Sequence, residues 1–230
     1  MSGSDAAKRA AADAAAELVQ DGMLVGLGSG STAKHLVIAV GRRVRAGLRI
    51  VGIPTSTETE ALALANGITL AELATEMIDL TIDGADEVER GTLRLIKGLG
   101  GALLREKIIA ESSRRFVVVA DASKVVDTLG ERAPLPVEVV RFGQGATARR
   151  LADLGGRPLL RRDHGGQPFV TDGGNVIYDC AGFAPIRDPF TLQRELHSIA
   201  GVVETGLFID RAEQAIIGAP DGSVSVMRRG

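Results

Sequence analysis

The chain has 230 residues, enough for one large domain, or for a medium and a small domain, with a core that needs no disulfide for support. Charged residues make up 24% of the sequence and the formal net charge is −2, so the basic surface with which nucleic-acid-binding proteins displace counterions is not expected. A single cysteine, Cys180, excludes an internal disulfide and is expected to be a small buried apolar side chain.

The first predicted element is an alanine-rich helix over residues 5–20, which ends at Asp21-Gly22 and leads into an apolar strand over residues 23–27. Five charged residues interrupt the first twenty: Asp5, Lys8, Arg9, Asp13 and Glu17. This segment therefore lacks the continuous apolar stretch of a signal peptide or a membrane span. We expect a cytoplasmic protein without a membrane partner.

Helices and strands then alternate through the first part of the chain. The pattern predicts helices over residues 33–44, 57–65 and 102–112, and strands over residues 49–53, 80–82, 93–96 and 115–120. Because strands joined by a helix usually run parallel, this order indicates a doubly wound α/β sheet.

The pattern changes after Pro134-Leu135-Pro136. Strands are predicted over residues 137–140, 157–160 and 175–180, and helices over residues 145–154 and 189–200. This β-α-β-β-α order suits a small α+β domain with an antiparallel sheet. Residues 206–209 and 215–226 are strand-like again and could rejoin the first sheet. We therefore expect a first domain of residues 1–132 and 205–230, with residues 133–204 inserted as a second domain.

Ligands of open α/β sheets bind at the carboxyl ends of the strands, where four loops of this chain lie. The first loop, residues 28–32, combines glycines and hydroxyl side chains at a helix N-terminus, which is typical of an anion or phosphate site. Gly28, Gly30 and Ala33 also match a loose dinucleotide-binding pattern, but no acidic residue ends the next strand to hold a ribose hydroxyl. A glycine turn that serves only packing is the other alternative.

The second loop, residues 83–87, places the three carboxylates of Asp83, Asp86 and Glu87 within five positions. Crowded carboxylates at a strand end indicate acid–base chemistry, hydroxyl recognition or a metal. One alternative is a turn in which Asp86 caps the following segment. The other is a magnesium site, although no histidine or further acidic cluster obviously completes its ligands.

The third loop, residues 97–101, leads directly into a helix. Lys97 lies beside glycines that let the backbone approach a ligand, so its ammonium can donate to a developing oxyanion. Glu106 shares one helix face with the apolar residues Ala102, Leu103, Ile109 and Ala110. Partial burial would raise its pKa toward the range of a general base. The alternative, a surface charge pair, is less favoured because Arg105 and Lys107 already supply the surface charge.

The fourth loop, residues 120–124, places Lys124 just past an apolar strand, where it can reach an anion. A solvated lysine is the alternative, and this applies with more force to Lys8. The three histidines, His35, His164 and His197, are scattered and show neither metal-ligand spacing nor a neighbouring nucleophile. We assign them no catalytic role.

Taken together in this order, the four loops and four later segments resemble the type A ribose-5-phosphate isomerases. The matching segments are residues 28–32, 83–87, 97–107, 120–124, 135–139, 170–175, 201–203 and 206–208. Each motif alone is weak, but the ordered set is specific and extends over nearly the whole chain. The resemblance implies a Rossmann-like doubly wound sheet with an inserted ferredoxin-like α+β domain, and a homodimer or homotetramer.

The resemblance also implies an activity: reversible isomerisation of D-ribose 5-phosphate to D-ribulose 5-phosphate through a cis-enediol(ate), in the non-oxidative pentose phosphate pathway, without a metal or other cofactor. Glu106 would carry the proton between C1 and C2. Asp83, Asp86 and Lys97 would assist ring opening and stabilise the enediolate.

Further residues are implied to bind the substrate. The phosphate would be held by Ser29, Gly30, Ser31 and Thr32, together with Lys124 and Lys8. The remaining contacts would come from Gly84, Ala85, Gly98, Leu99 and Gly100. The chain departs from the family at Leu99, where many members have glycine.

Two functions of other classes compete with this interpretation. A sugar-phosphate-sensing module would usually carry a DNA-binding domain, and the sequence before the first strand has no room for a helix-turn-helix. Acyl or coenzyme A transfer with Glu106 as nucleophile would gain nothing obvious from the crowded carboxylate loop.

Overall fold

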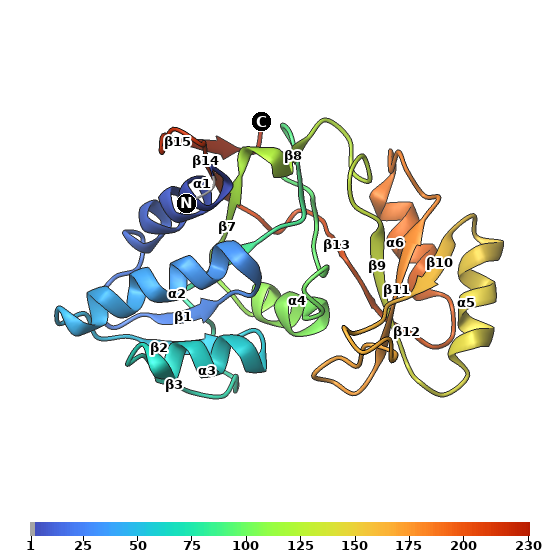
Figure 1. The fold of residues 1–230 in the computed structure, drawn as a ribbon, viewed down its shortest axis with the longest axis horizontal. Helices are drawn as coiled ribbons and strands as arrows, with labels where there is room; N and C mark the ends of the chain where they lie inside the picture. Colours follow the sequence, from blue (N-terminus) through green and yellow to red (C-terminus); the bar gives the residue numbers. More distant parts are fainter. Residues whose placement is uncertain (1–2) are drawn as a thin grey trace.

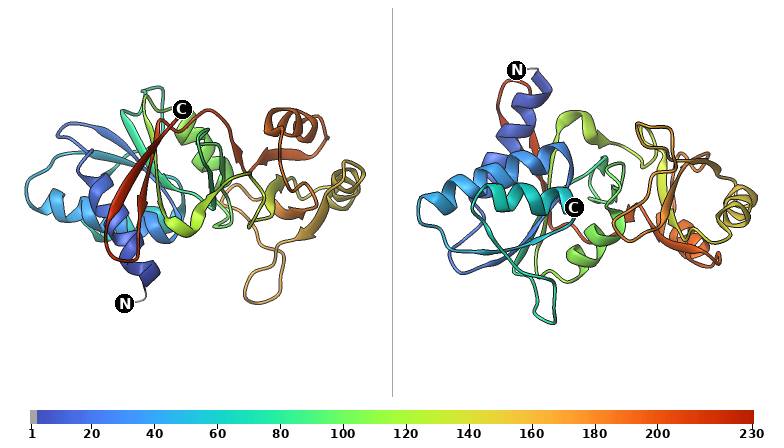
Figure 2. Two further views of the ribbon diagram at one scale, coloured as in Figure 1. Left: turned by 90° about the horizontal axis from the view of Figure 1, so that it is seen from above. Right: turned by 60° about the horizontal axis from the view of Figure 1, so that its bottom comes forward.

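The computed structural model describes residues 3–230, so Met1 and Ser2 of the predicted first domain lie outside the described residues. Figure 1 shows a large α/β body beside a smaller one, and both views in Figure 2 show the same division. None of the helices within residues 3–230 combines the length and the apolar composition that a membrane span requires.

The large body is built on a seven-stranded sheet in the described part of the chain, with the order β15-β14-β7-β4-β1-β2-β3. Its strands are β1 (Leu24–Leu27), β2 (Val51–Pro54), β3 (Thr69–Leu70), β4 (Leu80–Gly84), β7 (Phe116–Asp121), β14 (Gln214–Gly218) and β15 (Val224–Arg228). Six of these strands are parallel and β15 runs antiparallel to β14. The strand order reverses between β1 and β4, and the loops that follow these two strands therefore meet at a switch point where ligands bind.

Helices cover both faces of this sheet because its central strands are apolar on both sides. On one face, α1 (Gly3–Ala16), α2 (Gly30–Arg45) and α3 (Thr57–Ala65) contribute to a single core with β1, β4 and β7. The buried residues of α1 are all alanines, whose small side chains let this helix lie close to α2. On the other face lies α4 (Leu103–Glu111), which carries Ile109 and Ala110 into the core.

The small body contains a four-stranded antiparallel sheet with the order β10-β11-β9-β12. Its elements are β9 (Leu135–Val139), α5 (Gln144–Asp153), β10 (Arg157–Leu160), β11 (Val176–Ala181), α6 (Pro189–His197) and β12 (Val202–Thr205). Leu151 of α5 and Leu196 of α6 pack into one core with the strands. The β-α-β-β-α-β order confirms the predicted antiparallel α+β unit and adds β12, which the sequence analysis did not predict.

A third, short sheet joins the two bodies. Its strands, in spatial order, are β13 (Leu207–Phe208), β6 (Leu95–Ile96), β5 (Glu87–Glu89) and β8 (Val125–Val126), the last preceded by the 3₁₀ helix Ala122–Lys124. The predicted doubly wound sheet with a second antiparallel sheet is confirmed. The domain boundaries at residues 132/133 and 204/205 stay a prediction.

Several predicted elements end at other residues in the structure. The helices α1 and α6 end at Ala16 and His197, before the predicted residues 20 and 200, and α2 begins at Gly30, before the predicted residue 33. The strand predicted over residues 93–96 is limited to Leu95–Ile96, because Leu93 adopts a positive φ of 55°. The strands β3, β5 and β8 were not predicted.

Candidate active site

The loops after β1 and β4 approach each other closely at the switch point. A Cβ atom on Gly28 would lie 2.5 Å from the Cα atom of Asp83, so only glycine fits there. The Oδ1 atom of Asp83 accepts hydrogen bonds from the N–H groups of Ser29 (2.9 Å) and Gly84 (2.7 Å). These contacts fix the Asp83 carboxylate at the end of β4.

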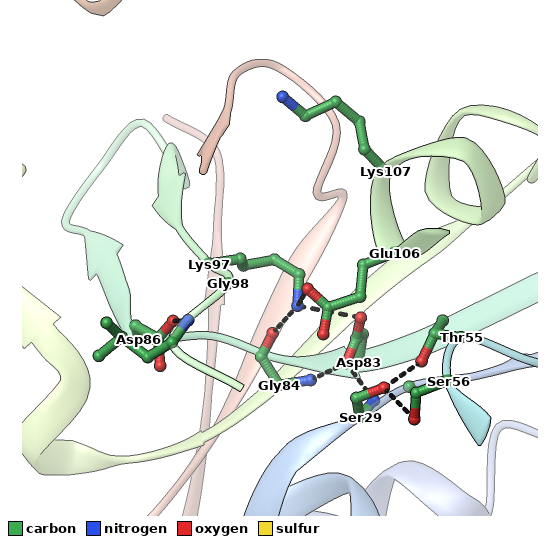
Figure 3. A network of polar contacts seen from close by, with 12 residues as sticks. Ser29, Thr55, Ser56, Asp83, Gly84, Asp86, Lys97, Gly98, Glu106 and Lys107 are labelled. Atoms are coloured by element: carbon green, nitrogen blue, oxygen red, sulfur yellow. Dashed lines mark hydrogen bonds and ion pairs between the residues drawn. The ribbon is translucent and has the colours of Figure 1, made fainter. Parts of the chain in front are cut away.

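Lys97 lies between two carboxylates (Figure 3). Its Nζ atom is 2.9 Å from Asp83 Oδ2 and 3.2 Å from Glu106 Oε2, and it donates a hydrogen bond of 2.7 Å to the carbonyl oxygen of Gly84. All three charged side chains are almost fully buried. The backbone of Lys97 is held by the short third sheet, because its N–H group donates to the carbonyl oxygen of Gly206 (2.9 Å). This hydrogen bond ties the backbone of Lys97 to the residue between β12 and β13.

The helix α4 carries Glu106 on its buried face, as predicted. Leu103, Ile109 and Ala110 are buried on the same helix, whereas Ile108 is 46% exposed. The prediction that Lys107 supplies surface charge is wrong, because Lys107 is buried and donates hydrogen bonds of 2.7 Å to Glu204 Oε1 and to the carbonyl oxygen of Thr205. Its partners lie almost 100 residues away, on the strand β12 that packs against α4.

Two carboxylate oxygens of this cluster remain without a hydrogen bond. The ammonium of Lys97 lies within ion-pair distance of Asp83 Oδ2 and Glu106 Oε2, yet neither oxygen accepts a hydrogen bond of good geometry from any described residue. Buried polar atoms without partners are costly and rare in folded proteins. Both oxygens therefore depend on the Lys97 ammonium, and Glu106 and Lys97 also line a cavity.

The electrostatics of the cluster favour proton transfer near neutral pH. The pKa of Glu106 is raised to about 8, mainly by burial and also by the negative charge of Asp83, while Lys97 opposes both effects. Burial also raises the pKa of Asp83 against the opposing effect of Lys97. Burial acts to lower the pKa of Lys97, but the charges of Asp83 and Glu106 outweigh it and raise that pKa overall. The cluster thus combines a permanent ammonium with a carboxyl group that can gain and lose a proton at physiological pH.

A cavity opens over this cluster and brings the four predicted loops together. It is lined by Ser29, Gly30, Ser31, Thr32, Gly84, Ala85, Asp86, Lys97, Gly98, Gly100, Glu106 and Lys124. Asp83 lies buried behind this lining. A larger cavity, which Ile53, Leu73 and Ile108 help to line, lies elsewhere on α4 and contains none of the clustered residues.

Besides Asp83, two of the predicted substrate-binding residues do not line the cavity. Leu99 is 40% exposed, although its N–H group donates to Asp86 Oδ2 (2.9 Å). Asp86 therefore fixes the glycine turn that follows Lys97 instead of capping the segment next to itself. Lys8 lies on α1 and is also absent from the cavity lining formed by the described residues.

Some residues near the site were missed by the sequence analysis. The Ser29 hydroxyl lies 2.5 Å from Thr55 Oγ1 and 3.0 Å from Ser56 Oγ, so its direction is fixed from β2 and α3. Thr55 and Ser56 directly follow β2. Ligands of open α/β sheets bind at the ends of such strands, so this position could have indicated both residues. Arg161 also reaches the site, from the small body, with hydrogen bonds to the carbonyl oxygens of Gly98 and Leu99. No periodicity or motif in the sequence indicates this contact.

The remaining candidate residues lie outside the cavity. His35 and His197 contact Asp5 and Glu204 at 3.0 and 2.9 Å. Cys180 is buried in the small body, as expected, and burial raises the pKa of its thiol to about 12. Within residues 3–230, no group of three or more His, Cys, Asp or Glu side chains has an arrangement that could hold a metal ion.

Comparisons with known proteins agree on one family. The family model described as ribose 5-phosphate isomerase A (phosphoriboisomerase A) matches residues 51–222. The ribose-5-phosphate isomerase A of Gluconobacter oxydans (strain 621H) is 54% identical over 226 residues, which cover 96% of this chain and 97% of the relative.

Solved structures give the same result. The ribose 5-phosphate isomerase A of Methanocaldococcus jannaschii is 40% identical with a TM-score of 0.91, covering 96% of this chain and 97% of that one. A D-ribose-5-phosphate isomerase solved in complex with phospho-erythronic acid is 38% identical with a TM-score of 0.92, again covering 96% and 97%.

Proposed function

Since the chain belongs to the ribose-5-phosphate isomerase A family, which interconverts ribose 5-phosphate and ribulose 5-phosphate, we propose that Asp83, Lys97 and Glu106 are the centre of that reaction in this protein. The observation that carries this assignment is the pair of buried carboxylate oxygens without a hydrogen-bond partner, on either side of the Lys97 ammonium and beneath the cavity. The site needs a base and an electrophile, and this cluster offers both.

Glu106 is the general base in this proposal. Its carboxylate removes the proton from C2 of the open-chain aldose, and the electron pair of the C–H bond forms the C1–C2 double bond while O1 gains negative charge. The ammonium of Lys97 stabilises that charge, as expected of a preorganised donor in a dry site. Glu106 then delivers its proton to C1 and the proton of the O2 hydroxyl passes to O1, so the enzyme returns to its initial protonation state.

Asp83 and Asp86 serve the earlier ring-opening step. That step moves the proton of the C1 hydroxyl to the ring oxygen, which requires a carboxylate near C1. Asp83 contacts Lys97 directly, and Asp86 lines the cavity. Either can relay the proton, and their variants distinguish them.

The phosphate binds at the N-terminus of α2. Ser29 is the N-cap residue of this helix but its side chain makes no capping hydrogen bond, because its hydroxyl contacts Thr55 and Ser56. The first N–H groups of α2 are therefore available to an anion, together with the hydroxyls of Ser31 and Thr32 and the ammonium of Lys124. Leu99 and Lys8, which do not line the cavity, remain weaker candidates for substrate contact.

The wider setting is part of the proposal. We expect the enzyme to act on its small sugar phosphate in the cytoplasm, within the non-oxidative pentose phosphate pathway, as a homodimer or homotetramer. Light scattering of the purified protein would test the oligomeric state. The alternatives of a sensing module and of acyl transfer lose their basis once the family is established.

The central test is Glu106→Gln, with Glu111→Gln as the matched control on the same helix. Glu111 is about half exposed and pairs with Arg211, so its substitution should leave kcat unchanged. Glu106→Gln should lose on the order of 10²–10⁴ in kcat, the usual contribution of a positioned general base. It should still bind phospho-erythronic acid, the ligand of the similar structure.

The reaction run in deuterated water separates the roles. Wild-type enzyme should incorporate solvent deuterium at the carbon that receives the proton, whereas Glu106→Gln should show neither isomerisation nor exchange. If Glu106→Gln still exchanged the C2 proton at a near wild-type rate, Asp83 or Asp86 would be the base and the assignment of Glu106 would be wrong.

A further inference from the structure

Arg161, directly after β10, reaches from the small body to the glycine turn of the active site. Its Nη1 atom donates hydrogen bonds to the carbonyl oxygens of Gly98 (2.8 Å) and Leu99 (3.1 Å). These carbonyls belong to the turn that begins directly after Lys97 and closes with a hydrogen bond from the Gly101 N–H group to the Gly98 oxygen (3.0 Å).

The guanidinium of Arg161 is itself rigidly held. Its Nε atom donates to Asp179 Oδ2 (2.9 Å), and its Nη2 atom donates to Asp179 Oδ1, which gives the two-point geometry that arginine forms with carboxylates. The two side chains are only 12% and 20% exposed. Phe169 closes the other end of the turn, because a Cβ atom on Gly101 would lie 2.4 Å from its ring. Arg161 and Phe169 of the small body thus contact the turn near both of its ends.

The two hydrogen bonds from Arg161 set the direction of two peptide groups. In a trans peptide the N–H and C=O bonds point in opposite directions. The carbonyls of Gly98 and Leu99 face Arg161, so the N–H groups of Leu99 and Gly100 point away from it. The first donates to Asp86 Oδ2 (2.9 Å), while the second donates to no acceptor among the described residues. Gly100 lines the cavity, so its N–H group is free to donate to a bound anion or oxyanion.

We propose that Arg161 is a positioning residue of the isomerase reaction, which orients the 98–101 turn so that its peptide groups hold Asp86 and face the substrate. The inference rests on the proposed function, because it takes the cavity over Lys97 and Glu106 as the substrate site. Arg161 acts through the turn and does not itself line the cavity. The inserted domain therefore contributes to catalysis through its contact with this turn.

The test compares Arg161→Met with Arg162→Met. Arg162 is the next residue, is exposed, and donates only to the carbonyl oxygen of Gly166 among the described residues. Arg161→Met should lower kcat by about 10- to 100-fold and change KM by less than about threefold, since a misplaced donor weakens mainly transition-state contacts. Arg162→Met should match wild type. The kcat of Arg161→Lys should lie between those of Arg161→Met and wild type, because one ammonium cannot replace the planar guanidinium of arginine.

The pH profile separates positioning from a general loss of structure. If Arg161→Met disturbs the turn alone, the pH midpoint of its kcat/KM profile stays at the wild-type value, while the plateau value of kcat/KM falls. A variant that let water into the site would shift the midpoint downward, because the pKa of Glu106 is raised by burial, and that result would contradict the proposal.

The remaining outcomes are also decisive. Wild-type kcat in Arg161→Met, with Glu106→Gln inactive, would overturn the role of Arg161 and leave the proposed function intact. An active Glu106→Gln would overturn the proposed function itself. If Arg161→Met does not fold, Arg161→Lys decides: a kcat below wild type with an unchanged pH midpoint supports the proposal, and an unchanged kcat overturns it.

Discussion

Glu106 and Lys107 are neighbours on α4, and both are buried, but they belong to two clusters of different character. Glu106 faces Lys97 and Asp83, and one oxygen of each carboxylate accepts no hydrogen bond from the described residues. Lys107 faces Glu204, whose Oε1 atom also accepts from the Thr205 N–H group and contacts His197. The first cluster leaves two carboxylate oxygens without a hydrogen-bond partner, whereas Glu204 Oε1 in the second cluster has several partners.

The ring of Phe208 lies close to one lysine of each cluster. The Nζ atoms of Lys97 and Lys107 lie 5.4 and 4.9 Å from its centroid, so the ring stabilises both ammonium groups by cation–π contact. Burial lowers the pKa of Lys107, although Glu204 opposes this effect. Burial acts to raise the pKa of Glu204, but Lys107 outweighs it and the pKa is lowered overall. Burial of a charge therefore does not distinguish the two clusters, whereas the cavity does, because Lys97 and Glu106 line it and Lys107 does not.

Lys107→Met should give the largest loss of stability. It leaves Glu204 without its main counter-charge, and removal of one partner from a buried pair costs about 3 kcal/mol or more. The free energy of unfolding, measured with urea, should fall by about this amount, while kcat per folded enzyme should stay within about threefold of wild type.

The control for this prediction is Lys34→Met, which removes an exposed lysine paired with Glu58 and should change stability by less than about 1 kcal/mol. If Lys107→Met lost activity as severely as Glu106→Gln, the two clusters would not be functionally distinct.

The stability of Glu106→Gln should show the opposite behaviour. The pKa of Glu106 is raised from 4.5 to about 8 in the folded protein, mainly by burial. Between these values the folded protein holds a proton that the unfolded chain releases, so this stabilising contribution is complete below about pH 4.5 and is lost as pH rises through about 8.

The glutamine side chain never ionises, so the variant does not suffer this loss. It should match wild type near pH 5 and exceed it by roughly 4 kcal/mol near pH 9. Urea unfolding at several pH values, with Glu111→Gln as control, measures the trend. An equal difference at every pH would show that Glu106 does not titrate with a raised pKa.

Lys124→Ala tests a residue that lines the cavity over Lys97 and Glu106. Lys124 lines the cavity from the 3₁₀ helix after β7 and should contact the phosphate, which is remote from the reacting carbons. The variant should raise KM about tenfold and change kcat less than about threefold, as expected when binding is weakened equally in ground and transition states. The KM of Lys8→Ala, measured in parallel, shows whether α1 contributes to phosphate binding. An unchanged KM would remove Lys124 from the site.

Chelation should have the smallest effect. The Lys97 ammonium already supplies a positive charge between Asp83 and Glu106, where the reaction needs an electrophile. Activity should therefore survive dialysis against EDTA. Loss of turnover that a divalent ion restores would contradict the role given to Lys97.

The sequence predicted the elements with strong periodicity. The helix α3 and the strand β10 begin and end as expected, at Thr57–Ala65 and Arg157–Leu160. It did not predict β5, whose sequence Glu-Val-Glu resembles an exposed segment. All three residues are buried, and the Glu87 carboxylate is compensated by hydrogen bonds from the N–H groups of Gly130, Arg132 and Ala133. Such compensation by distant backbone cannot be inferred from local composition.

The same limit applies to the candidate site. The loops at the strand ends could be predicted because the topology of an open sheet brings them together, and the structure does place residues of all four around one cavity. The burial of Lys107 and the contact of Arg161 with the glycine turn depend on how the small body packs against the large one. Neither a helical period nor a short motif encodes that packing.

The N–H group of Lys97 donates to the carbonyl oxygen of Gly206, and β6 pairs with β13, so this lysine is fixed by residues more than 100 positions further along the chain. The strand β14 also lies between β7 and β15 in the large sheet, so the final segment of the chain completes that sheet. During synthesis, which proceeds from the N-terminus, the small domain can fold before these last strands leave the ribosome. Nascent chains should therefore remain inactive until the last strands emerge, and this late, long-range closure should limit the rate at which active enzyme forms.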